Sequence, residues 1–526
     1  MEQETDKYSK KRITIWEPGI LILGFLLSIM AAAICMQIMG QFGIAPNTAL
    51  IGAVLVMLVS KIPITMAVRL RNLERQNYVL SISSAAGFSA ANCGFIAIAT
   101  MFVLGRNDLI IPVSIGALVG SLIAVFIIGR IFDSRIFPAT GPWPNGQAVA
   151  TTVLAGNEGG KRGFQLVQGL IVGAVASFLG IPAAGIGIAF ISNMVAIGAM
   201  AVGIVLRGYS PYLFGWLYEG FEISDTNIAQ GVMIGAGFVA FIQIIAAITK
   251  GSKKAVLSQN EFYTSDKQVR NTLVIGVGLF MVGAVVIAII TGVFSDMGIG
   301  MSALWVVYSG FAAMLVMMLV GTSSMQAGWA PAFAVVTMCL TVGMLIGFPA
   351  MPLAVLVGYI GAVGLPMTDA AASLKAGWII RGKGKDKEHE EFGRKQQIIL
   401  KHMGVVIGIA MSILFGVALT QGGVIPPMSS FYAYTVREVV DIALLRELAI
   451  WSVPGMALQA IFGSKSVGLM LAAGLLIPNP ILGITILVSL GLRLVIGTKH
   501  MNVRGPGLIA GDGLFGFGTN LFRMFF

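Results

Sequence analysis

Three prolines stand close together in the stretch 137–151 of an otherwise apolar chain. Pro138, Pro142 and Pro144 remove three backbone donors within seven residues. Such backbone cannot face lipid, because each unmet polar group costs several kcal/mol there. We therefore expect the stretch to line protein or a water-filled cavity inside a membrane. An ordinary proline-rich loop at the membrane interface is the alternative interpretation.

The residues that follow these prolines could bind an anion. A short helix that starts near Asn145 would point its free N–H groups into the cavity, and helix N-termini attract carboxylates. We expect the N–H groups of Asn145 and Gly146 to hold such a carboxylate and Trp143 to pack on an apolar part of the same ligand. The candidate ligand contacts in this stretch are Trp143, Pro144, Asn145, Gly146 and Gln147.

A second stretch, residues 365–377, resembles the first in its leading proline and its small residues. Asp369 lies between an apolar run and a helix of small residues, and a carboxylate at that depth is a candidate for proton binding or a paired charge. Thr368 is a further candidate ligand contact, and Lys375 follows one to two turns along the same helix. A solvated helix N-terminal residue, favoured by the helix dipole, is the alternative for Asp369.

A third carboxylate, Asp512, stands between glycines just inside the last apolar stretch. Glycines allow close backbone approach and broken helices. Asp512 is therefore a candidate ion or proton site, with a structural N-cap as the alternative, and Glu158 is the next candidate. A carboxylate can carry a proton near neutral pH only where burial disfavours its charged form.

The composition indicates which solvent surrounds these residues. The 526-residue chain is 57% hydrophobic and 11% charged, whereas soluble domains carry roughly 25% charged residues. A transmembrane helix needs about 20 apolar residues. The apolar runs predict an all-α polytopic membrane protein with about 14–16 transmembrane segments, in two repeat halves with short broken or re-entrant helices. The pieces 138–156, 366–380 and 466–477 are too short to say whether they cross.

Basic clusters mark the cytoplasmic side of membrane proteins. They predict a cytoplasmic N-terminal tail over 1–18, retained rather than cleaved as a signal peptide, and a basic cytoplasmic connecting loop over 250–271. The first transmembrane half would then be 19–249 and the second 272–526. The basic segment from Lys375 to Lys401 should also lie inside. These cytoplasmic placements require the piece 138–156 to cross the membrane and the piece 366–380 not to cross it fully. The two short pieces therefore give conflicting answers if both are counted in the same way.

A weak internal repeat supports the division into halves. The aligned pairs are Pro144 with Pro366, Ala148 with Ala370, Ala150 with Ala372, Gly169 with Gly404 and Gly173 with Gly408. Secondary carriers are commonly built from such repeats, although chance similarity in a chain rich in glycine and alanine is the alternative.

Several kinds of chemistry lack support in the sequence. No Gly-x-x-x-x-Gly-Lys-Ser/Thr phosphate loop is present, and His389-Glu390-Glu391 lacks the second histidine of a zinc protease motif. The net charge of +11 comes from clusters between apolar runs and not from a basic stripe interleaved with aromatics, so we expect no nucleic-acid partner. We expect no enzyme activity, no cofactor and no metal site.

Three blocks of this chain resemble the oligopeptide transporter (OPT) superfamily, which includes the yellow-stripe-like metal-chelate carriers. The first block is Gly141-Pro-Trp-Pro-Asn-Gly-Gln-Ala-Val-Ala, and the second is Thr368-Asp369 through Lys375-Ala-Gly377, followed by Arg394-Lys-Gln-Gln. The third block is Gly507-Leu-Ile-Ala-Gly-Asp-Gly513. The resemblance implies about 16 transmembrane helices and proton-coupled symport of small peptides or of metal complexes of peptide-like chelators.

From the residues and the resemblance together we expect a secondary active transporter of the cell membrane that works by alternating access. The substrate would sit near the midplane between 141–156 and 366–377, with the coupling proton, H+, on Asp369 or Asp512 and Glu158 as the next candidate. A passive channel and an intramembrane enzyme are the alternatives. The substrate, the coupling stoichiometry and whether the chain forms a homo-oligomer stay open.

Overall fold

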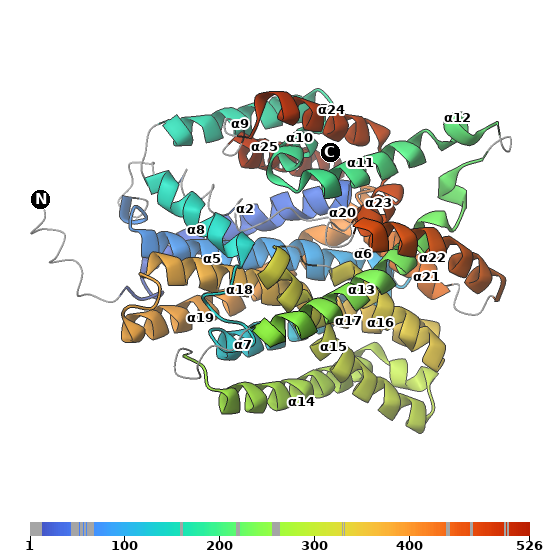
Figure 1. The fold of residues 1–526 in the computed structure, drawn as a ribbon, viewed down its shortest axis with the longest axis horizontal. Coiled ribbons are helices and arrows are strands. Elements are labelled where there is room, and N and C mark those ends of the chain that lie inside the picture. Colours follow the sequence, from blue (N-terminus) through green and yellow to red (C-terminus); the bar gives the residue numbers. More distant parts are fainter. Residues whose placement is uncertain are drawn as a thin grey trace, which may run out of the picture.

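The protein is built from helices that run roughly along one direction (Figure 1). The computed structural model describes residues 13–43, 52, 56, 59, 68–157, 161–216, 221–254, 263–328, 330, 332–437, 442–462, 467–498, 501 and 504–525. Within these residues the only β-pairing is a single bridge between Phe132 and Phe137. The predicted all-α polytopic membrane fold is confirmed.

The helices up to the middle of the chain are α2 (Pro18–Phe42), α5 (Leu73–Ser89), the π-helical turn η1 (Ala90–Phe95), α6 (Ile96–Val103), η2 (Asn107–Leu109), α7 (Ile110–Ile131), α8 (Pro144–Asn157), α9 (Lys161–Phe178), α10 (Ala183–Ile191), α11 (Met194–Gly208), α12 (Ser210–Phe214), η3 (Ile223–Asp225) and α13 (Ile228–Lys254).

The helices of the second part are α14 (Asp266–Thr291), η5 (Val293–Asp296), α15 (Ile299–Ala327), α16 (Ala332–Ile346), α17 (Ala350–Ile360), α18 (Gly364–Ile380), α19 (Lys387–Met411), the π-helical turn η6 (Ser412–Gly416), α20 (Val417–Gln421), α21 (Pro427–Arg437), α22 (Ile442–Phe462), α23 (Val467–Leu475), α24 (Pro480–Ile496) and α25 (Arg504–Phe525). Both α13 and α14 extend into the predicted loop 250–271.

Seven helical spans of the described residues are long and apolar enough to cross a membrane, and five shorter apolar helices accompany them. The outward side chains fit this environment. On α14, for example, Val274, Val282 and Ile289 are exposed by 69%, 60% and 65%. An apolar face of this kind is suited to lipid rather than to water.

Several helices are too short to cross a bilayer on their own. The 14 residues of α8 reach about 21 Å, against a hydrocarbon core of about 30 Å. The helices α10 and α23 have only 9 residues each. The chain also breaks between α10 and α11, where the Asn193 side chain caps α11 by accepting from Val195 N and Ala196 N.

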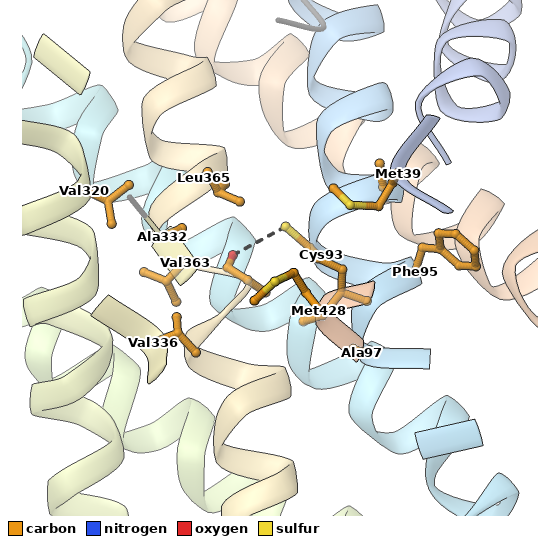
Figure 2. Close-up of a cluster of buried hydrophobic side chains, with 14 of the residues drawn as sticks. Met39, Cys93, Phe95, Ala97, Val320, Ala332, Val336, Val363, Leu365 and Met428 are labelled. Carbon is orange, nitrogen blue, oxygen red and sulfur yellow. Dashed lines mark hydrogen bonds between the residues drawn. The ribbon is translucent and has the colours of Figure 1, made fainter. Parts of the chain in front are cut away.

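The short piece 366–380 is not an independent segment. Residues 350–380 form one span, broken between α17 and α18 at Gly361–Val363. The carbonyl of Ala362 in this break accepts from Ser121 Oγ at 2.8 Å and from Cys93 Sγ at 3.9 Å. Figure 2 shows Cys93 directed at this break from η1. The break is thus sheltered by protein, as irregular backbone at membrane depth must be.

The glycines of the predicted repeat make equivalent close contacts between helices. A Cβ at Gly404 or Gly408 of α19 would lie 2.3 Å and 2.4 Å from carbonyl oxygens of α5, and a Cβ at Gly169 or Gly173 of α9 would lie 2.4 Å from carbonyl oxygens of α25. The two repeats therefore use one packing device. Both pairs join a helix of the first predicted half to a helix of the second.

We expect Gly408→Ala to lower the free energy of unfolding by about 1–3 kcal/mol, because the added methyl group meets backbone on α5 and neither helix can yield cheaply. Gly278→Ala in α14 is the matched control, since a Cβ there meets nothing within 4 Å. The control should be neutral or slightly stabilising. Denaturant unfolding of the purified protein in detergent measures both values, and equal effects would contradict the packing argument.

Candidate functional site

The proline-rich turn before α8 is held rigidly by its tryptophan. Trp143 has a positive φ of 38° and is only 1% exposed. Its ring centroid lies 5.9 Å from the ring centroids of both Phe132 and Phe137. The indole N–H donates to Pro138 O, and the backbone N–H donates to Met325 O, both at 2.9 Å. These contacts support a role for Trp143 in shaping the turn, whereas its predicted contact with a ligand stays a prediction.

A buried lysine satisfies the backbone that the prolines leave unpaired. Lys375 of α18 is 3% exposed, and its Nζ donates to Ala139 O at 2.6 Å and to Gly141 O at 3.0 Å. The ammonium also lies 4.5 Å from the ring centroid of Trp378. The stretches 137–151 and 365–377 are therefore joined, and their predicted proximity is confirmed.

Two side chains at the start of α8 bond to neighbouring loops. Asn145 Nδ2 donates to Gly328 O at 2.9 Å, and Gln147 Nε2 donates to Pro142 O at 2.6 Å. Gly328 has φ 70° and closes α15 against this turn. Both amide side chains thereby fix the direction in which α8 leaves the turn.

The start of α8 has one closed face and one open face. A Cβ at Gly146 would lie 2.7 Å from Lys375 Cβ and 2.8 Å from Ala372 O, so this face is packed on α18. Pro144 and Gln147 are exposed. The start of α8 is therefore accessible from the side of these two residues.

Asp369 forms a buried ion pair. Its Oδ2 accepts from Lys401 Nζ at 2.6 Å, and Lys401 also donates to Ser84 Oγ at 2.7 Å. The side chains of Asp369 and Lys401 are 2% and 1% exposed. The paired-charge hypothesis for Asp369 is confirmed, and the solvated alternative is wrong. Neighbouring Thr368 is also buried, and its hydroxyl donates to Leu365 O at 2.8 Å within the helix.

Lys401 escaped the sequence analysis, which treated it as a charge of a basic cytoplasmic segment. In the structure Lys401 lies within α19, Lys387–Met411, and is 0% exposed. The Asp386 side chain starts this helix by accepting from His389 N at 3.0 Å. The spacing of the residues could have indicated this burial. Glu390, Gln397 and Lys401 recur at helical intervals on the same face of α19 as the glycines that contact α5.

Polar side chains continue from this ion pair along α5, α18 and α19. One turn away, Gln397 Nε2 donates to Ser81 Oγ at 3.2 Å and to Ser373 O at 2.8 Å. Beyond it, Arg381 Nη1 donates to Gln397 Oε1 at 2.9 Å, and Arg381 pairs with Glu390 through two bonds of 2.8 and 2.9 Å. We call these connected residues the polar seam, and its members are Ser81, Ser84, Asp369, Ser373, Arg381, Glu390, Gln397 and Lys401.

The polar seam ends at the surface and contains unpaired groups. A cavity of ≈ 350 Å³ is lined by Arg381, Glu74 and His389. Asn77 on α5 is 0% exposed. Within the described part of the chain neither of its amide atoms has a hydrogen-bond partner, nor does Ser373 Oγ. Buried polar groups without a partner cost about 1–3 kcal/mol each, and such places commonly hold water.

Asp512 occupies a different kind of site. It is 2% exposed, and its Oδ2 accepts from Ala184 N at 2.7 Å at the start of α10. At the other end of α10, Arg493 Nη1 donates to Ala189 O and Ser192 O, both at 2.7 Å. Asp512 and Arg493 thus cap the two ends of α10. This supports the capping alternative for Asp512, although Asp512 itself belongs to α25. A proton on Asp512 stays a prediction.

Glu158 lies outside the described residues. Among those that the structure describes, no group of three or more His, Cys, Asp and Glu side chains could hold a metal ion.

We expect Asp369→Asn to lower the free energy of unfolding by about 3–5 kcal/mol, because it leaves Lys401 charged and unpaired in the interior. The double variant Asp369→Asn/Lys401→Met removes both charges and should recover most of this loss. Denaturant unfolding in detergent measures all three proteins. A double variant no more stable than Asp369→Asn alone would contradict the pairing.

The comparison with protein families agrees with this architecture. Residues 16–275 match the family model described as OPT oligopeptide transporter protein, a range that contains α5 and the proline-rich turn. No curated protein matches the chain. The match joins the helical membrane fold to the same superfamily that the three motif blocks resemble, and we conclude that residues 16–275 belong to the oligopeptide transporter (OPT) family.

Proposed function

We propose that the protein is a secondary active transporter that couples inward proton movement to the uptake of small peptides or peptide-like metal chelates. The family supports a multi-pass membrane transporter of the oligopeptide type. Proton coupling and alternating access are our additions. The observation that carries them is the buried pair of Asp369 and Lys401, with an Nζ–Oδ2 distance of 2.6 Å.

The ion pair suits a coupling device because its two charges lie on different helices. Protonation of Asp369 would cancel its charge and leave the ammonium of Lys401 without its counter-ion in the interior. An unpaired buried charge is costly, so the protein would favour a state in which Lys401 finds another anion. A substrate carboxylate is such an anion. Proton binding and substrate binding would then reinforce each other, as linkage requires.

The polar seam would supply the route by which the proton leaves. Its groups step from Asp369 past Gln397 to the surface cavity at Arg381. The unpaired atoms of Asn77 and Ser373 lie on the same two helices, α5 and α18, and they can hold water that passes the proton between side chains.

The site for substrate in this proposal is the junction of α8 and α18. The predicted contacts Asn145, Gly146 and Gln147 stand at the start of α8, where N–H groups favour a carboxylate. Thr368 and Asp369 belong to the packed face of α18. Alternating access would have to open this junction, because Gly146 and Lys375 are in direct contact.

We expect wild-type protein in proteoliposomes to accumulate radiolabelled tri-alanine, or a ferric complex of a peptide-like chelator, only when an inward proton gradient is imposed. Asp369→Asn/Lys401→Met should retain downhill exchange but lose gradient-driven accumulation. Asp512→Asn is the control that removes a charge elsewhere. Uptake by this variant should still depend on the proton gradient, and the variant protein should unfold at a lower temperature.

Two results would decide against this mechanism. Gradient-driven accumulation that survives in the double variant would remove Asp369 from the coupling step. Wild-type flux that is passive and does not respond to the proton gradient would favour a channel instead.

A further inference from the structure

A larger cavity of ≈ 540 Å³ lies at the other end of the span Leu73–Val103 from the surface cavity at Arg381. Its walls come from the ends of α6, α11 and α23, from the start of α13, and from α21 and η3. In Figure 1 this is the end where α21, α22 and α23 lie. The volume falls within the range of about 300–1,000 Å³ that is typical of small-molecule sites.

Two arginines at this cavity are anchored by helix ends. Arg207 Nη1 donates to Leu475 O at 3.3 Å and also to Leu476 O, both at the end of α23. Arg437 Nη2 donates to Val103 O at the end of α6. A guanidinium has five N–H donors, so each arginine keeps donors for a ligand. Helix C-termini carry only about half a negative charge, which leaves the positive charge of each arginine partly unbalanced.

One carboxylate lines the same cavity. Asp225 belongs to η3 and is exposed, as are the hydroxyl-bearing Ser430 and Tyr434 of α21. The charged residues of the wall are thus Arg207, Arg437 and Asp225. Two cations and one anion around one cavity match a ligand that itself carries both signs of charge.

We propose that this cavity is a binding site for a small zwitterion, whose carboxylate bonds to Arg207 and Arg437 and whose ammonium faces Asp225. The site is separate from the junction of α8 and α18. The inference rests on the proposed function in one respect, since the ligand would be a peptide-like substrate before it enters the transport path. If the arginines only cap helices, their loss changes stability but not the choice between ligands.

The test uses the full-length protein in lipid nanodiscs, without a proton gradient, and isothermal titration with three probes. The probes are tri-alanine, tri-alanine amide and N-acetyl-tri-alanine. Wild type should bind tri-alanine at least about tenfold more tightly than either derivative, because each derivative loses a charge-assisted contact. Arg437→Gln should lose the preference over the amide, and Asp225→Asn should lose the preference over the acetylated peptide.

A control from the same end of the molecule separates this site from general charge effects. Arg106 follows α6 and pairs with Asp108 at 2.8 Å, and it does not line the cavity. Arg106→Gln should leave all three affinities unchanged. Arg437→Lys keeps the charge and should keep part of the preference, which guards against a glutamine variant that fails to fold.

Equal wild-type affinities for tri-alanine and its amide, or no binding of tri-alanine, would overturn the proposal. So would unchanged preferences in a folded Arg437→Gln variant. Failure of the transport mechanism looks different, because wild type would then show the expected preferences in titration but no proton-driven uptake in proteoliposomes.

Discussion

The structure depends on one constraint, which is that every interruption of a helix inside the membrane must find partners for its freed backbone groups. Lys375 bonds to two carbonyls of the proline-rich turn. Arg493 and Asp512 close the two ends of α10. Charged side chains therefore act here as backbone caps brought from distant helices. This use explains how a chain with so few charges can bury several of them without exposing polar backbone to lipid.

The same constraint separates the two predicted proton sites. Asp512 accepts from a backbone N–H, so its negative charge stabilises a helix N-terminus, and neutralising it would weaken that helix. Asp369 instead faces a cation, Lys401, on another helix. Loss of its charge would change how α18 packs against α19, whereas both helices would stay folded. A proton bound at Asp369 would therefore change the conformation more than a proton bound at Asp512.

The parts of the site whose chemistry is local could be predicted from the sequence. Proline spacing marked the turn, and an isolated carboxylate in an apolar run marked Asp369. The partner could not be predicted in this way, because Lys401 is 32 residues away and lies in a basic segment that is typical of the cytoplasmic side. The burial of Trp143 was equally out of reach, since it follows from a positive φ and two phenylalanine rings. Residue type predicts what a group can do, whereas only the fold decides what it meets.

The contacts of α18 suggest how a proton could move it. Gly404 and Gly408 hold α19 closely against α5, so Lys401 belongs to a rigid pair of helices. Asp369 belongs to α18, which Lys375 ties to the turn before α8. These two units are clamped at the surface end by Arg381 and Glu390 and held three turns deeper by the pair of Asp369 and Lys401. Cancelling the deep charge, while the surface clamp and the bond from Gln397 to Ser373 O persist, would release the part of α18 that precedes Ser373. The junction of α8 and α18 would be affected through Ala372, whose carbonyl oxygen packs against Gly146 of α8.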